Sequence, residues 1–143
     1  MRFCIERLEQ ERVLGILKET DGLFDPPFSA AVDLEQYSAK LASKAYFGLA
    51  YSDGGGLAGV VAFYLNDAVK QIYTPFVCVY LQFRHQHVAS SLMDYIIKSN
   101  KGYTSMALEV LKTNTAALAL YNRMNFKVVE EREHNYLLRL DIK

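Results

Sequence analysis

The residues with the clearest chemical potential stand where a predicted strand passes into a predicted helix, in the segment VCVYLQFRHQHVASSLM. The first turn of a helix leaves backbone N–H groups unpaired, and the helix dipole adds about half a positive charge there. A helix start of this kind binds anions such as phosphate. The small side chains of Ala89, Ser90 and Ser91 would let a phosphate come close to the backbone. On these residues alone an ordinary strand-to-helix loop is favoured, and a phosphate-binding site is the alternative interpretation.

The elements before this junction follow from the spacing of the apolar residues. Alternation of apolar and polar residues over positions 3–5 predicts a short first strand. Apolar residues at helical spacing predict a helix over Gln10–Thr20, and Pro26-Pro27 then enforces an ordered loop. Asp33, with a glutamine three residues later, predicts the N-cap of a second helix.

Three strands are predicted next. The runs AYFGLAYS and LAGVVAFYLN flank Asp53-Gly54-Gly55-Gly56, which is a strong hairpin-turn signal. The second run is apolar on both faces, as is typical of a central strand. QIYTPFVCVY is a further strand. Because proline cannot donate to a strand ladder, Pro75 within it indicates a bulge or a point where the strand leaves its neighbour.

The remainder of the chain alternates helices and strands. A helix begins near Val88 and closes at Lys101-Gly102, SMALEVL is a strand, and Asn114 to Met124 is helical. FKVVEER and NYLLRLD form a final hairpin. Antiparallel hairpins at both ends with a β-α-β unit between them predict an α/β fold. We expect a mixed, mostly antiparallel central sheet of about seven strands flanked by helices, in one domain over residues 1–143.

Composition limits the classes of protein that this chain can be. Of its 143 residues 51% are apolar and 22% charged, which is a globular composition. Sixteen basic and sixteen acidic residues cancel, so the long-range attraction typical of nucleic-acid and membrane-surface binders is missing. The N-terminal sequence lacks the apolar core of a signal peptide, and the longest apolar stretch is about half a membrane span. We expect a soluble, cytoplasmic protein that binds neither nucleic acid nor membrane.

Two segments resemble the GNAT superfamily of acetyl-coenzyme A-dependent N-acetyltransferases. That family has Arg/Gln-x-x-Gly-x-Gly/Ala at its strand-to-helix junction, where this chain has RHQHVA from Arg84 to Ala89. Its later signature, L-x-V-x-x-x-N-x-x-A-x-x-L-Y-x-x-x-G-F, is similar to LEVLKTNTAALALYNRMNF from Leu108 to Phe126. The predicted order of strands and helices also fits the GNAT fold over essentially the whole chain. The resemblance implies an acyltransferase that uses acetyl-coenzyme A as cosubstrate and needs no metal.

The resemblance also implies which residues bind the coenzyme. Main-chain groups of Val79 would pair with the pantetheine arm like an added strand, and Asn114 would hydrogen-bond the same arm. Arg84 would lie near the pyrophosphate. Backbone N–H groups would hold that pyrophosphate, and they belong to His85, Gln86, His87, Val88, Ala89 and Ser90.

For catalysis, the resemblance implies that Tyr121 is the general acid beside the sulfur. Without the family pattern, a tyrosine on an apolar helical face is typical of a core residue. A phenol can donate a proton to the leaving thiolate as the C–S bond breaks, and a main-chain N–H near Val79 could stabilise the oxyanion. Glu109 is our candidate base for the attacking amine, and an exposed strand residue without a chemical role is the alternative interpretation.

The chain departs from the family pattern at three positions. His87 stands where the first glycine is usual, Leu81 where proline is common, and Asn125 where a glycine precedes Phe126. If the backbone at His87 has a positive φ, histidine costs about 1 kcal/mol or more there. Since the N–H groups survive the change, we expect weakened rather than abolished coenzyme binding. Asparagine is the next-best residue after glycine for a left-handed helix C-cap.

The amine acceptor is the least determined part of the function. Phe24, Phe28 and Tyr73 are expected around the acceptor pocket, because the proline-stiffened loop would hold its shape beside the sheet. Neutral charge and an aromatic loop favour the primary amine of a small molecule, with an amino sugar first. A protein N-terminus and an aminoglycoside-like amine are the alternatives. The protein would act as a monomer or a homodimer.

Two other functions are alternatives to the acetyltransferase. A coenzyme A-binding sensor module without catalysis is the second hypothesis, motivated by His87. A Rossmann-type nucleotide binder is disfavoured, because no Gly-x-Gly-x-x-Gly follows the first strand. The three histidines show no metal-ligand spacing. Cys78 is expected to be a buried structural residue rather than a nucleophile, because no acid-base partner for it is evident.

Overall fold

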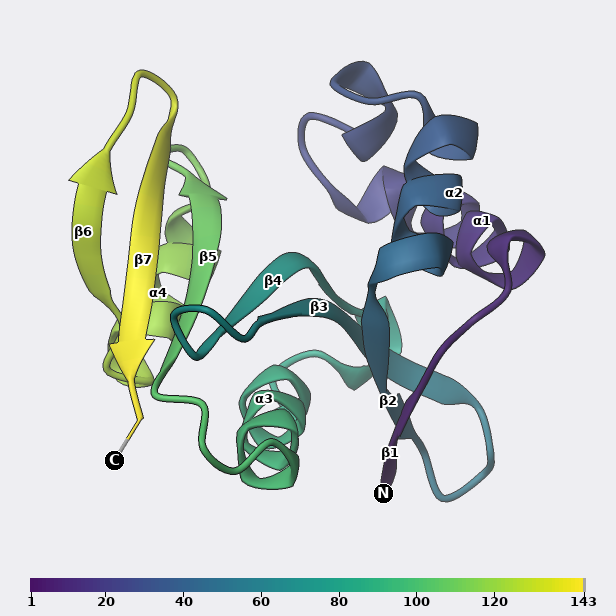
Figure 1. Ribbon diagram of the computed structural model, residues 1–143. Coiled ribbons are helices and arrows are strands. Elements are labelled where there is room, and N and C mark those ends of the chain that lie inside the picture. Colours follow the sequence, from purple (N-terminus) through teal and green to yellow (C-terminus); the bar gives the residue numbers. More distant parts are fainter. Residues whose placement is uncertain (143) are drawn as a thin grey trace. The chain divides into compact units, whose positions relative to one another are not determined.

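The computed structural model describes residues 1–142, which fall into two compact units. Unit 1 comprises Met1–Phe63 and Phe76–Ile96, and unit 2 comprises Tyr64–Pro75 and the described chain after Ile96. Figure 1 shows the elements of both. Strands β3 (Leu57–Asn66) and β4 (Gln71–Val79) and helix α3 (Val88–Ser99) each have residues in both units.

Seven strands form a mixed sheet with hydrogen bonding in the order β1-β2-β3-β4-β5-β7-β6. The pairs β1–β2, β2–β3, β5–β7 and β6–β7 are antiparallel, and β4–β5 is parallel. This order confirms the predicted sheet and the central position of the third strand. The strands are β1 (Arg2–Glu6), β2 (Tyr46–Tyr51), β3 (Leu57–Asn66), β4 (Gln71–Val79), β5 (Ser105–Leu111), β6 (Lys127–Glu131) and β7 (Asn135–Asp141).

Residues 1–142 contain four α-helices, and the caps that the sequence predicts at Asp33 and Asn125 are both present. The helices are α1 (Gln10–Thr20), α2 (Leu34–Lys44), α3 (Val88–Ser99) and α4 (Thr115–Arg123). The Asp33 carboxylate accepts from the Gln36 backbone N–H (3.1 Å) and so caps α2. Asn114 caps α4 rather than forming its first turn, because its Oδ1 accepts from the backbone N–H of Ala117 (3.2 Å). Asn125 has a φ of 74°, which is the left-handed C-cap predicted there.

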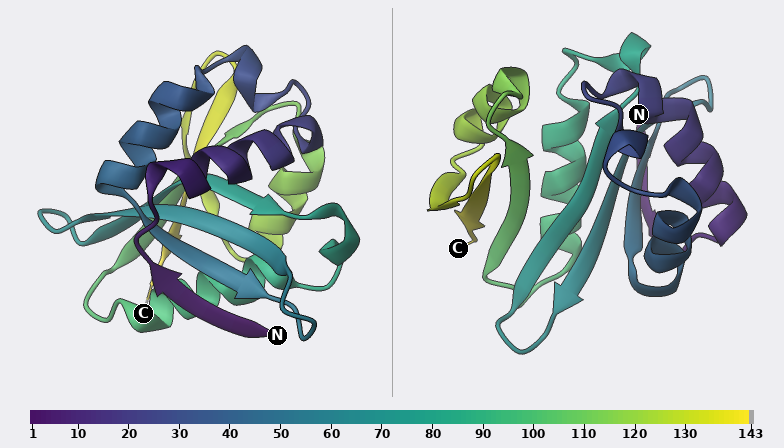
Figure 2. Two further views of the ribbon diagram at one scale, coloured as in Figure 1. Left: turned by 90° about the vertical axis from the view of Figure 1, so that its right-hand side faces the viewer. Right: turned by 90° about the horizontal axis from the view of Figure 1, so that it is seen from above.

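In unit 1 the sheet is covered on both faces. Helices α1 and α2 lie on one face of β1–β3 and α3 lies on the other (Figure 2). The Phe3 ring on β1 contacts Tyr95 on α3, with 5.7 Å between centroids. The largest fully buried side chains of unit 1 are Phe47, Phe63, Leu17, Leu41, Leu49, Leu92, Met93, Ile96 and Val13. This core fixes the end of β4 and the start of α3, which the sequence marks as the chemical junction.

Gly59 on β3 lets the first turn of α3 approach the sheet closely. A Cβ built at Gly59 would lie 2.9 Å from Cγ1 of Val88 and 3.4 Å from the carbonyl oxygen of Cys78. Val88 is the first residue of α3 and its side chain is stiff, because valine branches at Cβ. The helix start itself would therefore have to move to make room.

We expect Gly59→Ala to lower the free energy of unfolding by about 1–3 kcal/mol through overpacking. Urea unfolding measures this change. Gly22→Ala is the matched control, because a Cβ at Gly22 would meet nothing within 4 Å. An equal loss in both variants would show that close packing at Gly59 is not the cause.

In unit 2, helix α4 lies against the sheet formed by β5, β7 and β6 (Figure 1). The Tyr121 ring packs edge-on against Phe126 with 5.4 Å between centroids. The parallel β4–β5 ladder runs from Gln71↔Ser105 to Tyr73↔Ala107 and ends two residues before Pro75. This end of the ladder fits the prediction that β4 leaves a neighbour at Pro75, since proline has no N–H to donate.

Candidate functional site

The loop before α3 is built to expose backbone N–H groups. His85 and His87 have φ values of 63° and 60°, and Gln86 between them is not in the left-handed region. Left-handed residues alternating with ordinary ones turn successive N–H groups toward one concave side, which is an anion-binding arrangement. In the described chain, the N–H groups of His85, Gln86 and His87 donate to no backbone carbonyl. The helix dipole of α3 adds to the same site.

The two histidines occupy strained backbone positions without packing that explains them. Both side chains are exposed. A left-handed conformation costs a residue with a Cβ about 1–2 kcal/mol. The positive φ at His87 is the conformation whose cost was considered from the sequence, and His87 stands where the family pattern usually has glycine. The loop therefore has, with histidine, a conformation that glycine adopts at a lower cost.

We expect His87→Gly to leave the free energy of unfolding unchanged or to raise it by up to about 1 kcal/mol, because the strain disappears while the unfolded chain gains freedom. Coenzyme affinity should be preserved or increased, as measured by calorimetry. Gln86→Gly is the control and should destabilise, since Gln86 has no strain to relieve. A large loss of affinity in His87→Gly would mean that the imidazole contacts the ligand.

The end of β4 is tied to the same loop. Nε of Arg84 donates to the carbonyl oxygen of Val79 (3.3 Å), and the Gln86 side-chain amide donates to the carbonyl of Gln82 (3.2 Å). The N–H of Tyr80 donates to the carbonyl of Ala58 on β3 (2.9 Å). Arg84 thus lies at the junction, and its guanidinium occupies the carbonyl group of Val79.

Cys78 has the properties of a structural thiol. It is buried, at 5% exposure, and burial raises the pKa of its thiol to about 11. The thiolate is the nucleophilic form of cysteine, so this side chain is inert at neutral pH. This agrees with the structural role expected from the sequence.

The loop between α1 and α2 carries an aromatic cluster. Phe24 and Phe28 contact each other and both contact Phe76 on β4, each pair with 5.7 Å between ring centroids. Phe28 also contacts Tyr37 on α2. The structure therefore brings Phe24 and Phe28 together at β4, while Tyr73, the third predicted acceptor residue, belongs to unit 2.

In unit 2, Tyr121 is a buried phenol without a hydrogen-bond partner. Its side chain is 5% exposed, and burial raises the pKa of its hydroxyl. Nothing in the described part of the chain hydrogen-bonds this hydroxyl, although buried tyrosine hydroxyls usually find a partner. Of the Asn114 side-chain amide, only the oxygen Oδ1 is engaged in a hydrogen bond with another described residue, because it caps α4. A free phenol in an apolar setting is a proton donor throughout the neutral pH range.

The candidate base Glu109 is already paired. Its carboxylate on β5 contacts the guanidinium of Arg132, which also contacts Glu130. Arg132 lies in the turn between β6 and β7, and sequence analysis did not single it out. Burial raises the pKa of the neighbouring Tyr73 phenol, and the charge of Arg132 opposes this effect. A cationic substrate amine would compete with Arg132 for Glu109.

Besides Tyr121, two completely buried hydroxyls in unit 2, those of Tyr64 and Thr74, have no hydrogen-bond partner among residues 1–142. No sequence signal identified them, because both lie within apolar strand runs. No set of three or more His, Cys, Asp or Glu side chains in residues 1–142 could hold a metal ion. Over the same residues, no helix has the length and apolar character to cross a membrane.

The chain is similar to known proteins in sequence and in fold. The model of the acetyltransferase (GNAT) family matches residues 11–126. Among curated proteins, no sequence match was found.

Solved structures share the fold at low sequence identity. The PaiA N-acetyltransferase of Thermoplasma acidophilum, in complex with coenzyme A, has a TM-score of 0.74 at 15% identity, over 99% of this chain and 100% of that one. The ribosomal-protein-S18-alanine N-acetyltransferase of Escherichia coli has a TM-score of 0.74 at 17% identity, over 99% of this chain and 95% of that one. Nourseothricin acetyltransferase has a TM-score of 0.63 at 20% identity, over 70% of this chain and 66% of that one.

Proposed function

This chain is a member of the GNAT family of acetyltransferases, whose acetyl donor is acetyl-coenzyme A, and we propose that it acetylates the primary amine of a small molecule, an amino sugar first among them. The observation that carries the proposal is the loop from His85 to His87, which keeps the conformation of an anion-binding loop directly before α3. Neutral net charge and the aromatic loop support a small acceptor over a basic protein tail.

In the proposed complex the coenzyme is held mainly by main-chain groups. N–H groups of the loop and of the first turn of α3, from His85 to Ser90, bind the pyrophosphate. Val79 pairs with the pantetheine arm, and Arg84 moves from the Val79 carbonyl toward the phosphates. Asn114 donates to the same arm through its amide nitrogen, because its Oδ1 is engaged at the helix cap. The solved complex of PaiA with coenzyme A supports a coenzyme role for this fold.

The proposed reaction is a direct transfer. The amine nitrogen attacks the thioester carbonyl, a C–N bond forms, and the C–S bond breaks. Tyr121 donates its proton to the leaving sulfur, and Glu109 takes the proton of the amine. For Glu109 to act, the amine must displace Arg132 from the carboxylate. The inert thiol of Cys78 supports direct transfer over an acetyl-cysteine intermediate.

The acceptor would be bound through aromatic side chains. Phe24 and Phe28 offer a rigid apolar surface, and Tyr73 offers a phenol. Residues 1–143 act as one catalytic domain in this proposal, because the family match begins in unit 1 and ends in unit 2. A cytoplasmic location and a monomeric or homodimeric state are part of the same proposal.

A coenzyme A-binding sensor without catalysis is the second candidate, favoured by the strained histidine in place of glycine at position 87. One assay separates the two. Free-thiol release from acetyl-coenzyme A is measured across a panel of amines that includes amino sugars, peptides with free N-termini and aminoglycosides. Acceptor-dependent release supports the enzyme. A sample stabilised by the coenzyme that releases no thiol with any amine supports the sensor.

A further inference from the structure

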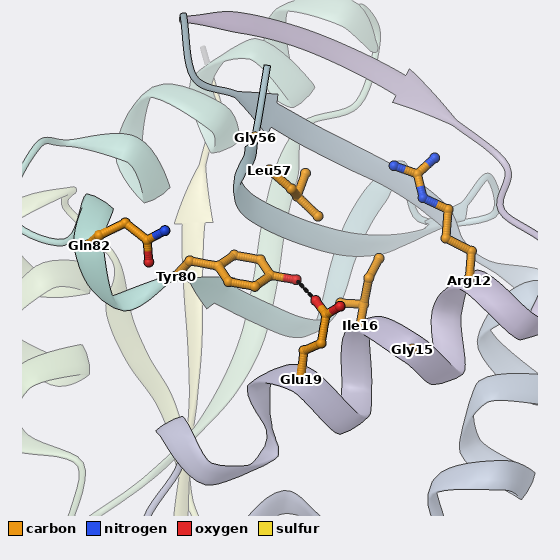
Figure 3. Close-up of a pocket in the computed structure, with 8 residues that line it drawn as sticks. All are labelled: Arg12, Gly15, Ile16, Glu19, Gly56, Leu57, Tyr80 and Gln82. Carbon is orange, nitrogen blue, oxygen red and sulfur yellow. Dashed lines mark hydrogen bonds between the residues drawn. The ribbon is translucent and has the colours of Figure 1, made fainter. Parts of the chain in front are cut away.

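Unit 1 contains a groove that the proposed coenzyme site does not use. Its volume is about 480 Å³, and it lies between α1, the start of β3 and the segment after β4 (Figure 3). None of the loop residues from 84 to 90 lines it. The lining residues are Arg12, Gly15, Ile16, Glu19, Gly56, Leu57, Tyr80 and Gln82.

The groove carries one positive and one negative charge on the same side of α1. Arg12 and Glu19 are seven residues apart, which places them on one helix face about 10 Å apart along the axis. At that spacing the two side chains are too far apart for the usual helical ion pair. Within residues 1–142 neither one forms a salt bridge with any other group.

Each charge is instead held by a tyrosine hydroxyl. Nη2 of Arg12 donates to the hydroxyl of Tyr51 (2.5 Å), and the hydroxyl of Tyr80 donates to Oε2 of Glu19 (2.9 Å). Oε1 of Glu19 and the other N–H groups of Arg12 have no hydrogen-bond partner among the described residues, and the charge of Glu6 also acts on Arg12. Both charges are therefore oriented by the protein and available to a ligand.

The wall between the charges is apolar and open. Gly15 and Gly56 have no side chains to obstruct it, and Ile16 and Leu57 supply apolar surface. Figure 3 shows Ile16 between the Glu19 carboxylate and Arg12, and Leu57 above the Tyr80 ring. A ligand that satisfies this lining has an ammonium at one end, a carboxylate at the other and a short apolar chain between them.

We propose that this groove binds a linear zwitterion longer than an α-amino acid, of the ω-amino acid or dipeptide class. Its ammonium contacts Glu19 and its carboxylate contacts Arg12, while the intervening methylene groups cover Ile16 and Leu57. This site is separate from the coenzyme loop, and its existence does not depend on the proposed acetyl transfer.

The test measures binding by amide chemical-shift changes in the full-length protein, with ε-aminocaproate as the probe. Caproate and n-hexylamine are matched ligands that carry only one of the two charges. We expect ε-aminocaproate to bind about fivefold more tightly than either, because each exposed charge contact contributes a factor of that order. The shifts should map to α1 and to residues near Leu57 and Tyr80, and should persist with saturating coenzyme A.

Charge-neutralising variants locate the contacts. Glu19→Gln should reduce the affinity for ε-aminocaproate about fivefold and leave caproate binding unchanged. Arg12→Gln should also reduce the affinity for ε-aminocaproate about fivefold, and it should leave n-hexylamine binding unchanged. Arg12→Lys keeps the charge and should retain zwitterion binding. Glu11→Gln is the control on the same helix and should have no effect. Equal binding of the three ligands, an equal loss in Glu11→Gln, or displacement by coenzyme A would each overturn the proposal.

Discussion

Tyr121→Phe should lower the turnover number by about a hundredfold to ten-thousandfold, the usual contribution of a general acid. The substitution removes the hydroxyl, and the ring keeps its packing against Phe126. Because nothing in the described chain hydrogen-bonds the hydroxyl, no protein contact is lost. Coenzyme affinity and melting temperature should therefore stay close to those of the unchanged protein. Thiol release with the true acceptor, calorimetry and thermal unfolding measure these three quantities.

The control for Tyr121→Phe is Tyr136→Phe. Tyr136 lies on β7, and the Lys112 ammonium lies over its ring. This substitution should leave turnover unchanged. Because burial raises the pKa of Tyr121 above its usual value of 10.0, the acid form persists up to that pH, and the wild-type rate should show no alkaline fall caused by this group below pH 10. An unchanged chemical step in Tyr121→Phe would identify the phenol as a packing residue, and a loss of affinity alone would assign it to binding.

Ser90→Glu should weaken coenzyme binding by roughly tenfold to hundredfold, because a carboxylate close to the pyrophosphate repels it in a partly desolvated site. The same substitution should leave the protein as stable or more stable by up to about 1 kcal/mol. Ser90 lies in the first turn of α3, where a negative side chain interacts favourably with the helix dipole. Affinity and stability thus move in opposite directions, which general damage to the fold would not produce.

Ser90→Gln is the matched control for the charge, because it has the size of glutamate without its negative charge. Because glutamine is larger than serine, it should weaken coenzyme binding, but less than glutamate does, and the difference between the two variants isolates the effect of the charge. Titration calorimetry gives the affinities, and urea unfolding gives the stabilities. Equal affinities for the glutamate and glutamine variants would place the pyrophosphate away from the start of α3 and would contradict the proposed coenzyme site.

Much of the fold and part of the site are readable from the sequence, because they depend on neighbours along the chain. The apolar run of β3, the bounds of α1 and the cap at Asp33 follow from periodicity and local hydrogen bonding. Asn125 in the left-handed region is equally local, since asparagine tolerates that conformation. At His87 the sequence showed only what a positive φ would cost, and the structure shows that the backbone adopts it.

The tertiary structure decided which distant residues meet. The sequence predicts the last hairpin, yet only the fold shows that β7 rather than β6 pairs with β5, and the Glu109–Arg132 contact exists in that arrangement. The bond between Tyr80 and Glu19 likewise joins residues that are 61 positions apart. Local propensity sets the type of each element, whereas strand order and side-chain pairing are set by how the apolar faces pack together. The sequence by itself therefore determined the elements and the family motifs, and only packing determined the charge environment of the candidate base and of the groove.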